Sequence, residues 1–349
     1  MSWKRWLLGT PFETERFREQ RLRVPIALAV FSSDALSSVA YATEEILLVL
    51  SIAGIAALGY SLPISAVIAL LLFIVIVSYR QTIHAYPDGG GSYIVARENL
   101  GTQWGLIAAG ALLLDYILTV AVSTAAGVAA MTSAFPGLLA YRVGLGLLFL
   151  FLLTVGNLRG VRQSGRIFAV PTYMFIFSMT CLILAGIYRA LMGYPPVEPP
   201  LAGFPEVRHT LNLWLLMKAF SAGCAALTGI EAVSNGVQAF RKPESRNAAL
   251  TLMIMAIILA FFFLGTSYLA HVYLVVPGAG QTVVSQLGRA IFGSGLLYYL
   301  MQIATAAILM VAANTAFADF PRLSSILARD RFLPRQLANL GDRLVYSNG

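Results

Sequence analysis

The sequence contains Ser32-Ser33-Asp34-Ala35-Leu36-Ser37-Ser38-Val39-Ala40-Tyr41 at the centre of an apolar segment that runs from about residue 24 to residue 51. An apolar segment of this length can cross a bilayer, which needs about 20 helical residues. A carboxylate at bilayer depth, however, costs about 2.5 kcal/mol or more. Small polar side chains compete for backbone hydrogen bonds, and irregular backbone persists in a membrane only where it is packed in protein or lines a cavity. The stretch therefore predicts a transmembrane helix that is broken around a polar site.

The composition of the 349-residue chain is that of an integral membrane protein with many spans. Hydrophobic residues make up 58% of it and charged residues 11%, whereas about 25% of the residues in a soluble domain are charged. No cleavable signal peptide is expected, because the first apolar segment is too long and too polar at its centre. Cys181 and Cys224 fall in expected spans, where we interpret them as small apolar side chains rather than a disulfide or a metal site.

Hydropathy predicts eight membrane spans and hence an all-α integral membrane fold. The expected spans are residues 24–51, 60–79, 103–131, 138–157, 166–191, 213–240, 248–276 and 294–320. With the N-terminus in the cytoplasm, the inside segments carry 19 Lys and Arg residues and the outside loops carry 4. This asymmetry predicts that orientation, and it accounts for the net charge of +8 without nucleic acid as a partner.

These spans divide the chain into five parts. They are an N-terminal segment at 1–23, spans 1 to 5 at 24–191, an outer proline-rich loop at 192–212, spans 6 to 8 at 213–320 and a basic amphipathic segment at 321–349. We expect the first and last parts on the cytoplasmic side, the last along the membrane surface. The proline-rich loop should be extended, because proline restricts the backbone.

Spans 1 and 3 each carry a carboxylate near mid-membrane. Asp34 and Tyr41 lie seven residues apart, which places them on one face if the helix is continuous. Asp115 is followed one turn later by Thr119 on the same face. Both pairs combine a carboxylate with a hydroxyl, so each predicts a polar lining made of oxygen atoms.

Span 6 is predicted to be interrupted like span 1. Gly223 and Gly229 bracket its centre and weaken the helix there. Thr228 and Glu231 are three residues apart, which would place them on one helix face. Spans 1 and 6 lie five spans apart, and this is the pattern of inverted repeats that bind substrate at their paired breaks.

The three carboxylates indicate the type of substrate. Around one cavity they cannot all stay ionised without a counter-ion, so a cation binds there or some of them are protonated. Carboxylate, hydroxyl and carbonyl oxygens suit hard cations. This favours a transporter that alternates between cation binding and protonation. The open alternative is structural: an acid could pair with Lys218 or cap a broken helix end.

The residues also resemble a known family. The run from Phe31 to Glu45 resembles the first helix of KimA-type potassium importers, which belong to the amino acid–polyamine–organocation (APC) superfamily. Supporting runs lie at 79–93, 114–116, 157–162 and 227–232. The resemblance covers essentially the whole chain. It implies the broken-helix, inverted-repeat fold of five plus five helices, which is the LeuT-like architecture.

The resemblance implies proton-coupled potassium uptake across the plasma membrane by a homodimer, with no cofactor besides the ions. The ion path would be lined by Asp34, Tyr41, Asp115, Tyr116, Thr119, Thr228 and Glu231. Of these, Asp34, Asp115 and Thr228 are expected to contact potassium directly. Glu231 is expected to carry the proton, because apolar neighbours favour a neutral carboxyl.

The family's fold has two inverted repeats of five helices each. The chain is expected to contain the first repeat in full and three helices of the second. Helices 9 to 12 and the cytoplasmic domain that responds to cyclic di-AMP are expected to be missing from it. Regulation by that nucleotide would therefore act only through a part that the chain does not contain.

Three alternative functions stay open. An amino acid or polyamine permease of the same superfamily usually has glycines at the first break, where N–H groups hold the substrate carboxylate. Here the break has no glycine, and Asp34 would repel a carboxylate. A membrane enzyme would need a catalytic pair or a metal cluster, but His84 and His209 fall on opposite sides and no zinc or haem spacing occurs. The third alternative is a cation sensor that does not transport.

Overall fold

The computed structural model describes residues 21–87, 91–158, 165–200, 210–278 and 280–339. Within these ranges the chain is helical and forms no sheet. The α-helices are α2 (Val24–Phe31), α3 (Ser33–Ser37), α4 (Val39–Ser51), α5 (Ile55–Leu58), α6 (Ser61–Ala85), α7 (Ser92–Leu100), α8 (Thr102–Ala134), α9 (Arg142–Leu158), α10 (Gly165–Leu191), α11 (Leu213–Gly223), α12 (Glu231–Asn235), α13 (Glu244–Val272), α14 (Val283–Phe292) and α15 (Leu296–Arg329). The 3-10 helices are η2 (Pro136–Tyr141), η3 (Cys224–Leu227), η4 (Val237–Ala239) and η5 (Arg335–Ala338).

The all-α membrane prediction is confirmed. In the described part of the chain, seven helical segments are long and apolar enough to cross a membrane: 55–85, 102–134, 136–158, 168–191, 213–235, 244–272 and 296–329. The first expected span, 24–51, is absent from that set because it is divided into α2, α3 and α4, of 8, 5 and 13 residues. The division falls at Ser32 and Ser38, within the polar stretch where the sequence predicted it.

Several boundaries differ from the expected ones. The eighth span does not end at residue 320, because α15 continues through Pro321 to Arg329. A proline removes one backbone hydrogen bond and bends a helix, but the helix can continue past the proline when its residues on both sides are packed against other helices. A further helix, α14, lies between the last two spans and was not expected. The predicted segments 1–23 and 321–349, and the proline-rich loop, lie partly outside the described residues.

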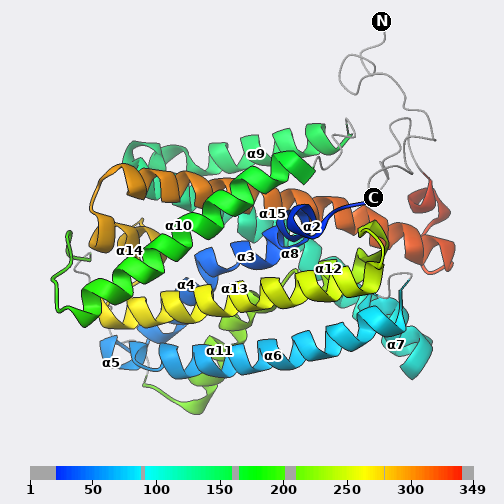
Figure 1. Ribbon diagram of the computed structural model, residues 1–349, viewed down its shortest axis with the longest axis horizontal. Coiled ribbons are helices and arrows are strands. Elements are labelled where there is room, and N and C mark those ends of the chain that lie inside the picture. The colour runs from blue at the N-terminus through cyan, green and yellow to red at the C-terminus, as the bar shows by residue number, and fades with distance from the viewer. Residues whose placement is uncertain (1–20, 88–90, 159–164, 201–209, 279, 340–349) are drawn as a thin grey trace, which may run out of the picture.

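The long helices run side by side between two ends of the molecule (Figure 1). One end carries α5 and α14 and is called here the α14 end. The other carries α7 and the start of α2 and is called the α7 end. There, Leu22 donates its N–H to the carbonyl of Ala239 at 2.7 Å and accepts the N–H of Arg241 at 3.1 Å. This short pairing ties the entry of the first span to the segment that follows α12.

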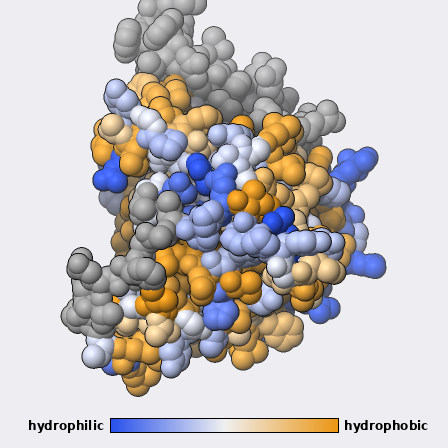
Figure 2. Space-filling model, turned by 90° about the vertical axis from the view of Figure 1, so that its left-hand side faces the viewer, coloured by the Kyte–Doolittle hydropathy of each residue, from blue (hydrophilic) through white to orange (hydrophobic). Residues whose placement is uncertain are grey.

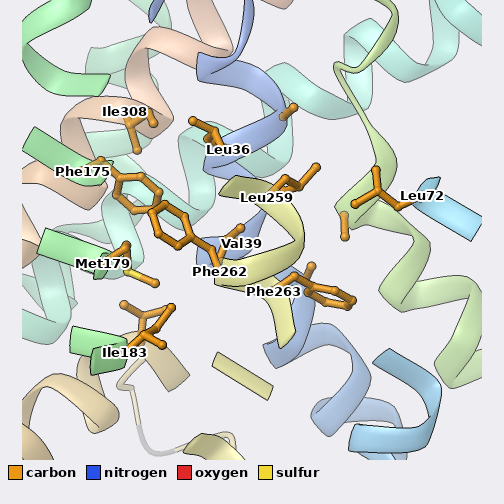
Figure 3. Packing of buried hydrophobic residues seen from close by; sticks show 14 of the residues in the cluster. Leu36, Val39, Leu72, Phe175, Met179, Ile183, Leu259, Phe262, Phe263 and Ile308 are labelled. Atoms are coloured by element: carbon orange, nitrogen blue, oxygen red, sulfur yellow. The ribbon is translucent and has the colours of Figure 1, made fainter. Parts of the chain in front are cut away.

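The apolar side of the first span packs in the hydrophobic core. Leu36 and Val39 are fully buried against residues of α10 and α13, including Phe175 and Phe262 (Figure 3). The rings of Phe175 and Phe262 meet edge to face, with centroids 6.1 Å apart. Because Leu36 is two residues from Asp34, the two side chains leave α3 in roughly opposite directions. Packing of Leu36 therefore fixes the direction in which Asp34 points.

The outer surface is apolar along the helices. On α9 no residue is buried, and large hydrophobic side chains such as Phe73, Leu114 and Phe151 are exposed. Seen from the α14 end, hydrophilic side chains gather over the middle of the face and hydrophobic ones lie around them (Figure 2). This distribution is that of a protein with lipid along its sides and water at its ends.

Candidate functional site

The first break is a bend in the helix rather than an opening. Ser33, Ser37 and Ser38 donate their hydroxyls to the carbonyls of Val30, Asp34 and Ala35, at 3.2, 2.8 and 2.6 Å. Ser32 does the same to the carbonyl of Leu28. The residues at the two junctions, Ser32 and Ser38, keep right-handed helical dihedral angles. Hydroxyls that bond to helix carbonyls bend a helix without opening it, so α3 remains a short helical turn that carries Asp34.

The second break is a true opening of the backbone. The α-helical part ends at Gly223, and η3 leads to Thr228, whose φ of −67° and ψ of 151° are extended. Gly229 follows with φ +76°, a conformation that side chains disfavour. Helix α12 then begins at Glu231. The prediction that Thr228 and Glu231 share a helix face is therefore wrong, because Gly229 turns the chain between them.

The two breaks lie against each other. A Cβ atom on Gly229 would lie 2.7 Å from Cγ of Asp34 and 2.8 Å from the backbone nitrogen of Ala35. Ser38 also donates to the carbonyl of Ala226 in η3, at 3.4 Å. Only a glycine permits this approach of backbone to carboxyl group. The carboxyl group of Asp34 is thus placed beside the opened backbone of the sixth span.

Asp34 is buried without a compensating partner. Its exposed fraction is 4%, and Oδ1 accepts no hydrogen bond from the described residues. The groups that act on it electrostatically are Glu231, Asp115 and Asp319, and all three are acidic. Burial of an unpaired carboxylate is costly unless it is protonated or meets a positive charge. The site therefore requires a proton or a cation.

The other predicted site residues lie on α4, on α8 and at the second break. Tyr41 is buried on α4, and its hydroxyl lies next to the side chain of Thr228. On α8, Tyr116 and Thr119 are buried and Asp115 is half-buried. Glu231, with an exposed fraction of 8%, acts electrostatically on Asp34 and Tyr116. The structure thus brings the acids of spans 1, 3 and 6 into one electrostatic neighbourhood.

This arrangement is not a chelating cluster. Among the described residues, no three His, Cys, Asp or Glu side chains gather closely enough to hold one metal ion. Oxygen atoms are instead contributed by carboxyls, hydroxyls and opened backbone, as suits a weakly held hard cation. Lys218 is exposed on α11 and is not among the groups that act on Asp34 or Glu231. Neutralisation of these acids by Lys218 is therefore not supported.

Sequence analysis did not single out three residues near the site. Asp319 on α15 acts on Asp34, Tyr116 and Glu231, and Tyr79 on α6 is affected by Glu231. Ser123 on α8 is fully buried, and its hydroxyl has no partner within the described residues. Ser123 lies one turn beyond Thr119, so the helical spacing could have indicated it. Asp319 lies at the end of the expected eighth span, where an aspartate is ordinarily exposed to water, so the sequence does not indicate a place in the site.

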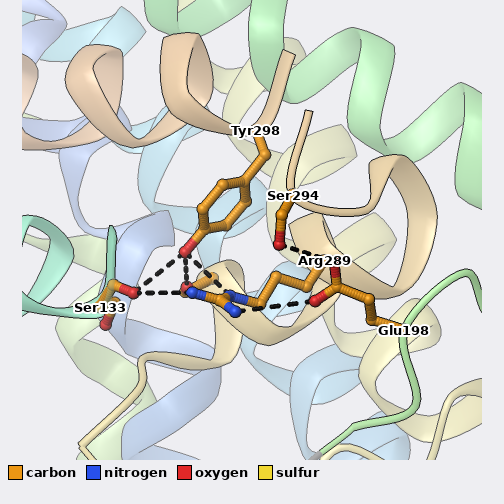
Figure 4. Close-up of polar contacts among 6 residues, drawn as sticks. Ser133, Glu198, Arg289, Ser294 and Tyr298 are labelled. Carbon is orange, nitrogen blue, oxygen red and sulfur yellow. Dashed lines mark hydrogen bonds and ion pairs between the residues drawn. The ribbon is translucent and has the colours of Figure 1, made fainter. Parts of the chain in front are cut away.

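A polar network lies at the α14 end (Figure 4). Arg289 donates to the hydroxyl of Tyr298 and to the carbonyl of Ser133, both at 3.3 Å, and lies 3.6 Å from a carboxylate oxygen of Glu198. Glu198 also accepts the hydroxyl of Ser294 at 2.6 Å. These contacts join the ends of α8 and α10–α11 to α14 and α15. They fix α14 to the neighbouring helix ends on that side.

Glu44 has a structural role at the same end. Its carboxylate accepts the N–H of Val283, at the first turn of α14, at 3.0 Å. A carboxylate at a helix N-terminus stabilises the helix. Glu44 therefore fixes α14 to the first span and does not belong to the group of acids around Asp34.

Comparison with known proteins agrees with this geometry. A family model described as amino acid permease matches residues 26–349. The chain is 48% identical over 350 residues to the potassium transporter KimA of Bacillus subtilis (strain 168), a match that covers 100% of this chain and 57% of that protein. It is 25% identical over 231 residues to the probable potassium transport system protein Kup 2 of Aeromonas hydrophila, covering 60% of this chain and 35% of that protein.

A more distant match is an uncharacterized transporter of Mycobacterium tuberculosis (strain ATCC 25618 / H37Rv), 22% identical over 280 residues, which covers 80% of this chain and 60% of that protein. The chain spans less than two thirds of the length of each of these relatives. The family model, in contrast, begins in α2 and includes both breaks. The chain therefore belongs to the amino acid permease family of the APC superfamily and has the broken-helix, inverted-repeat fold of that family.

Proposed function

We propose that this chain forms the ion path of a potassium importer that moves potassium together with protons by alternating access. The observation that carries the proposal is the carboxyl group of Asp34, which is buried against Gly229. Among the described residues, one of its oxygens has no hydrogen-bond partner and the groups acting on it electrostatically are acidic. Such a group stays ionised only when a cation is bound beside it. The names of the relatives from Bacillus subtilis and Aeromonas hydrophila support potassium as that cation.

Each predicted residue has a role in the proposal. Asp34, Asp115 and Thr228 contact the potassium ion, and the backbone opened at Thr228 and Gly229 adds carbonyl oxygens. Tyr41, Tyr116 and Thr119 line the path with hydroxyls. Glu231 carries the proton: when it is neutral, Asp34 can be ionised at a smaller cost, so protonation of one acid favours cation binding at the other.

An amino acid permease is the competing function within the same family. A substrate carboxylate needs backbone N–H groups at the first break. At that break the helical dihedral angles persist at Ser32 and Ser38, and Asp34 lies against the second break. A substrate carboxylate would therefore meet negative charge there. This favours the cation over the amino acid.

The proposal includes an orientation and an assembly. In the described residues, the α7 end carries Arg80, Arg97, Arg241 and Lys242, whereas the α14 end carries Arg142, Arg189 and Arg289. Together with the rest of the positive charge in the sequence, this supports an orientation with the α7 end and the N-terminus in the cytoplasm of a plasma-membrane protein. On the resemblance alone we add a homodimer and control by cyclic di-AMP through a domain outside this chain.

Rescue of a potassium-uptake-deficient bacterium tests the proposal. Two forms are expressed in that bacterium: the 349-residue chain, and the same chain continued by the remaining length of its Bacillus subtilis relative. Growth is measured in medium with a low potassium concentration, and rubidium uptake is measured with and without a proton gradient. Growth and gradient-dependent uptake are expected from at least the longer form. The Asp34→Asn variant should lose both, whereas Glu244→Gln, which changes an acid paired with Arg21 away from the site, should keep both.

Two outcomes would contradict the proposal. If neither form takes up rubidium while labelled amino acids enter, the amino acid permease is the better assignment. If rubidium uptake persists in Asp34→Asn protein at wild-type rates, the buried carboxyl group is not the cation ligand. Membrane levels of each variant are measured by immunoblot, so that loss of protein is not mistaken for loss of activity.

A further inference from the structure

We infer that Asp319 forms a second cation-binding position in the path, at its α7 end, and that Arg322 occupies this position as a tethered cation when no potassium is there. The inference rests on the proposed function and extends it beyond the residues that the sequence indicated. It concerns how the ion leaves the central site. Its evidence comes from the packing of α15, the electrostatic interactions of Asp319 and its ion pair with Arg322.

The packing of α15 places Asp319 beside the central site. Ala316 and Leu323 of α15 are buried in one cluster with Tyr116 of α8. Asp319 lies three residues after Ala316 and four before Leu323, so it shares their helix face. Its side chain is 16% exposed. The carboxyl group therefore faces α8 next to Tyr116, rather than the open surface.

Electrostatics connect this position with the central acids. Asp319 acts on Asp34 and Glu231 as well as on Tyr116. It follows Asn314 and Thr315 along α15 in the direction of the α7 end. A cation that leaves Asp34 toward that end would therefore meet a second carboxylate. Successive weak sites of this kind allow an ion to bind and still leave.

Arg322 provides the charge that an empty position requires. Its Nη1 lies 2.7 Å from Oδ1 of Asp319, and its side chain is 61% exposed. An ion pair with one partner so exposed contributes little to stability and exchanges readily. A potassium ion that arrives at Asp319 can displace the guanidinium group into water, and the guanidinium returns when the ion has left. The carboxylate is thus neutralised in both states.

The pair Arg21–Glu244 serves as the matched control. It also joins an exposed arginine to a less exposed carboxylate at the α7 end, with side chains 49% and 29% exposed. Glu244 is not among the groups that act electrostatically on Asp34 or Glu231. If the loss of any surface ion pair changed potassium-dependent stabilisation, variants of both pairs would show the change. A specific effect on cation binding should appear only in variants of the Asp319–Arg322 pair.

A double-mutant cycle on potassium binding tests the inference. The protein used is the purified longer form, in which the 349-residue chain is continued by the remaining length of its Bacillus subtilis relative. Its thermal unfolding in detergent is followed at increasing potassium chloride, with choline chloride keeping the ionic strength constant. Arg322→Gln should lower the potassium concentration of half-maximal stabilisation by about three- to tenfold, because the tethered competitor is gone. Asp319→Asn should raise it by a similar factor. The double variant should match Asp319→Asn, and Arg21→Gln should match the wild type.

The outcomes separate this inference from the proposed function. If the longer form with wild-type residues shows no stabilisation by potassium over choline, the proposed function fails. If the wild type responds but Arg322→Gln does not shift the midpoint, the inference is overturned and the function stands. The inference is also overturned if the effect of Arg322→Gln persists in the Asp319→Asn background, because the arginine would then act elsewhere.

Discussion

The two broken spans differ in what they present to the space between them. In the first, hydroxyls of Ser33, Ser37 and Ser38 bond to helix carbonyls, and the residues at the junctions keep helical angles. In the sixth, Thr228 is extended and Gly229 is left-handed. The first break therefore presents a carboxylate on a nearly intact helix, whereas the sixth presents backbone. The first span thus contributes the carboxyl group of Asp34, and the sixth contributes the opened backbone at Thr228 and Gly229 in addition to Glu231.

This difference explains the choice of residues at each break. A buried carboxylate must be held in a fixed direction to act as a ligand, and α3 is held by Leu36 in the core. The opened backbone must approach that carboxyl group closely, which only Gly229 allows. Substitutions at the sixth span should therefore damage the fold, and those at the first should mostly change its bend.

The largest effect is expected from Gly229→Ala. The new methyl group would lie 2.7 Å from Cγ of Asp34 in a left-handed backbone, so the two breaks must separate. We expect a loss of about 3 kcal/mol in the free energy of unfolding, measured by detergent-induced unfolding in mixed micelles. Gly193→Ala is the control, because Gly193 has a similar φ of +69° with nothing within 4 Å. It should lose only about 1 kcal/mol, and equal losses would show that contact with Asp34 is unimportant.

A smaller effect is expected from Thr228→Val at the opened backbone. Its hydroxyl donates to the carbonyl of Ala225 at 3.0 Å and faces Tyr41. Loss of one oxygen ligand should weaken potassium binding about tenfold, with little change in unfolding temperature. Thr132→Val removes a similar bond, from a buried threonine on α8 to the carbonyl of Ala129 at 3.2 Å. Equal weakening in both variants would argue against Thr228 as a ligand.

The sequence predicted the places of both breaks, because serines around Asp34 and the glycines of span 6 weaken a helix wherever they occur. It could not give the form of the sixth break. Spacing put Thr228 and Glu231 on one helix face, whereas Gly229 turns the backbone between them. Which glycine becomes left-handed depends on the neighbouring helix that approaches it, and here that helix carries Asp34. This tertiary contact leaves no periodic signal in the chain.

The sequence also missed Asp319 for a physical reason. An aspartate two residues before a proline at the end of an apolar segment is usually interpreted as the water-exposed end of a helix. Helix α15 instead continues to Arg329, and the face that carries Asp319 packs on α8. Burial of that face depends on residues two hundred positions earlier in the chain, so local hydropathy does not reveal it.

A third effect, smaller again, is expected where the two breaks touch through Ser38. Its hydroxyl donates to the carbonyl of Ala35 at 2.6 Å and to that of Ala226 at 3.4 Å. Ser38→Ala should cost about 1 kcal/mol of unfolding free energy, because the carbonyl of η3 loses a buried donor. Ser38→Thr, which keeps the hydroxyl, should recover most of this loss. If Ser38→Ala is neutral, the link between the breaks is not a stabilising contact.

The smallest effect is expected from Ser33→Ala, which tests whether bending alone matters. The hydroxyl of Ser33 donates to the carbonyl of Val30 at 3.2 Å within its own span and is fully buried. That bond competes with the helix, and alanine favours the helix, so the change in unfolding free energy should stay within about 0.5 kcal/mol. Potassium binding should be unchanged, because Asp34 is directed by the packing of Leu36. A large loss of binding in Ser33→Ala protein would mean that the serine bonds, rather than the core, direct the carboxyl group, and the contrast between the two breaks would then have to be redrawn.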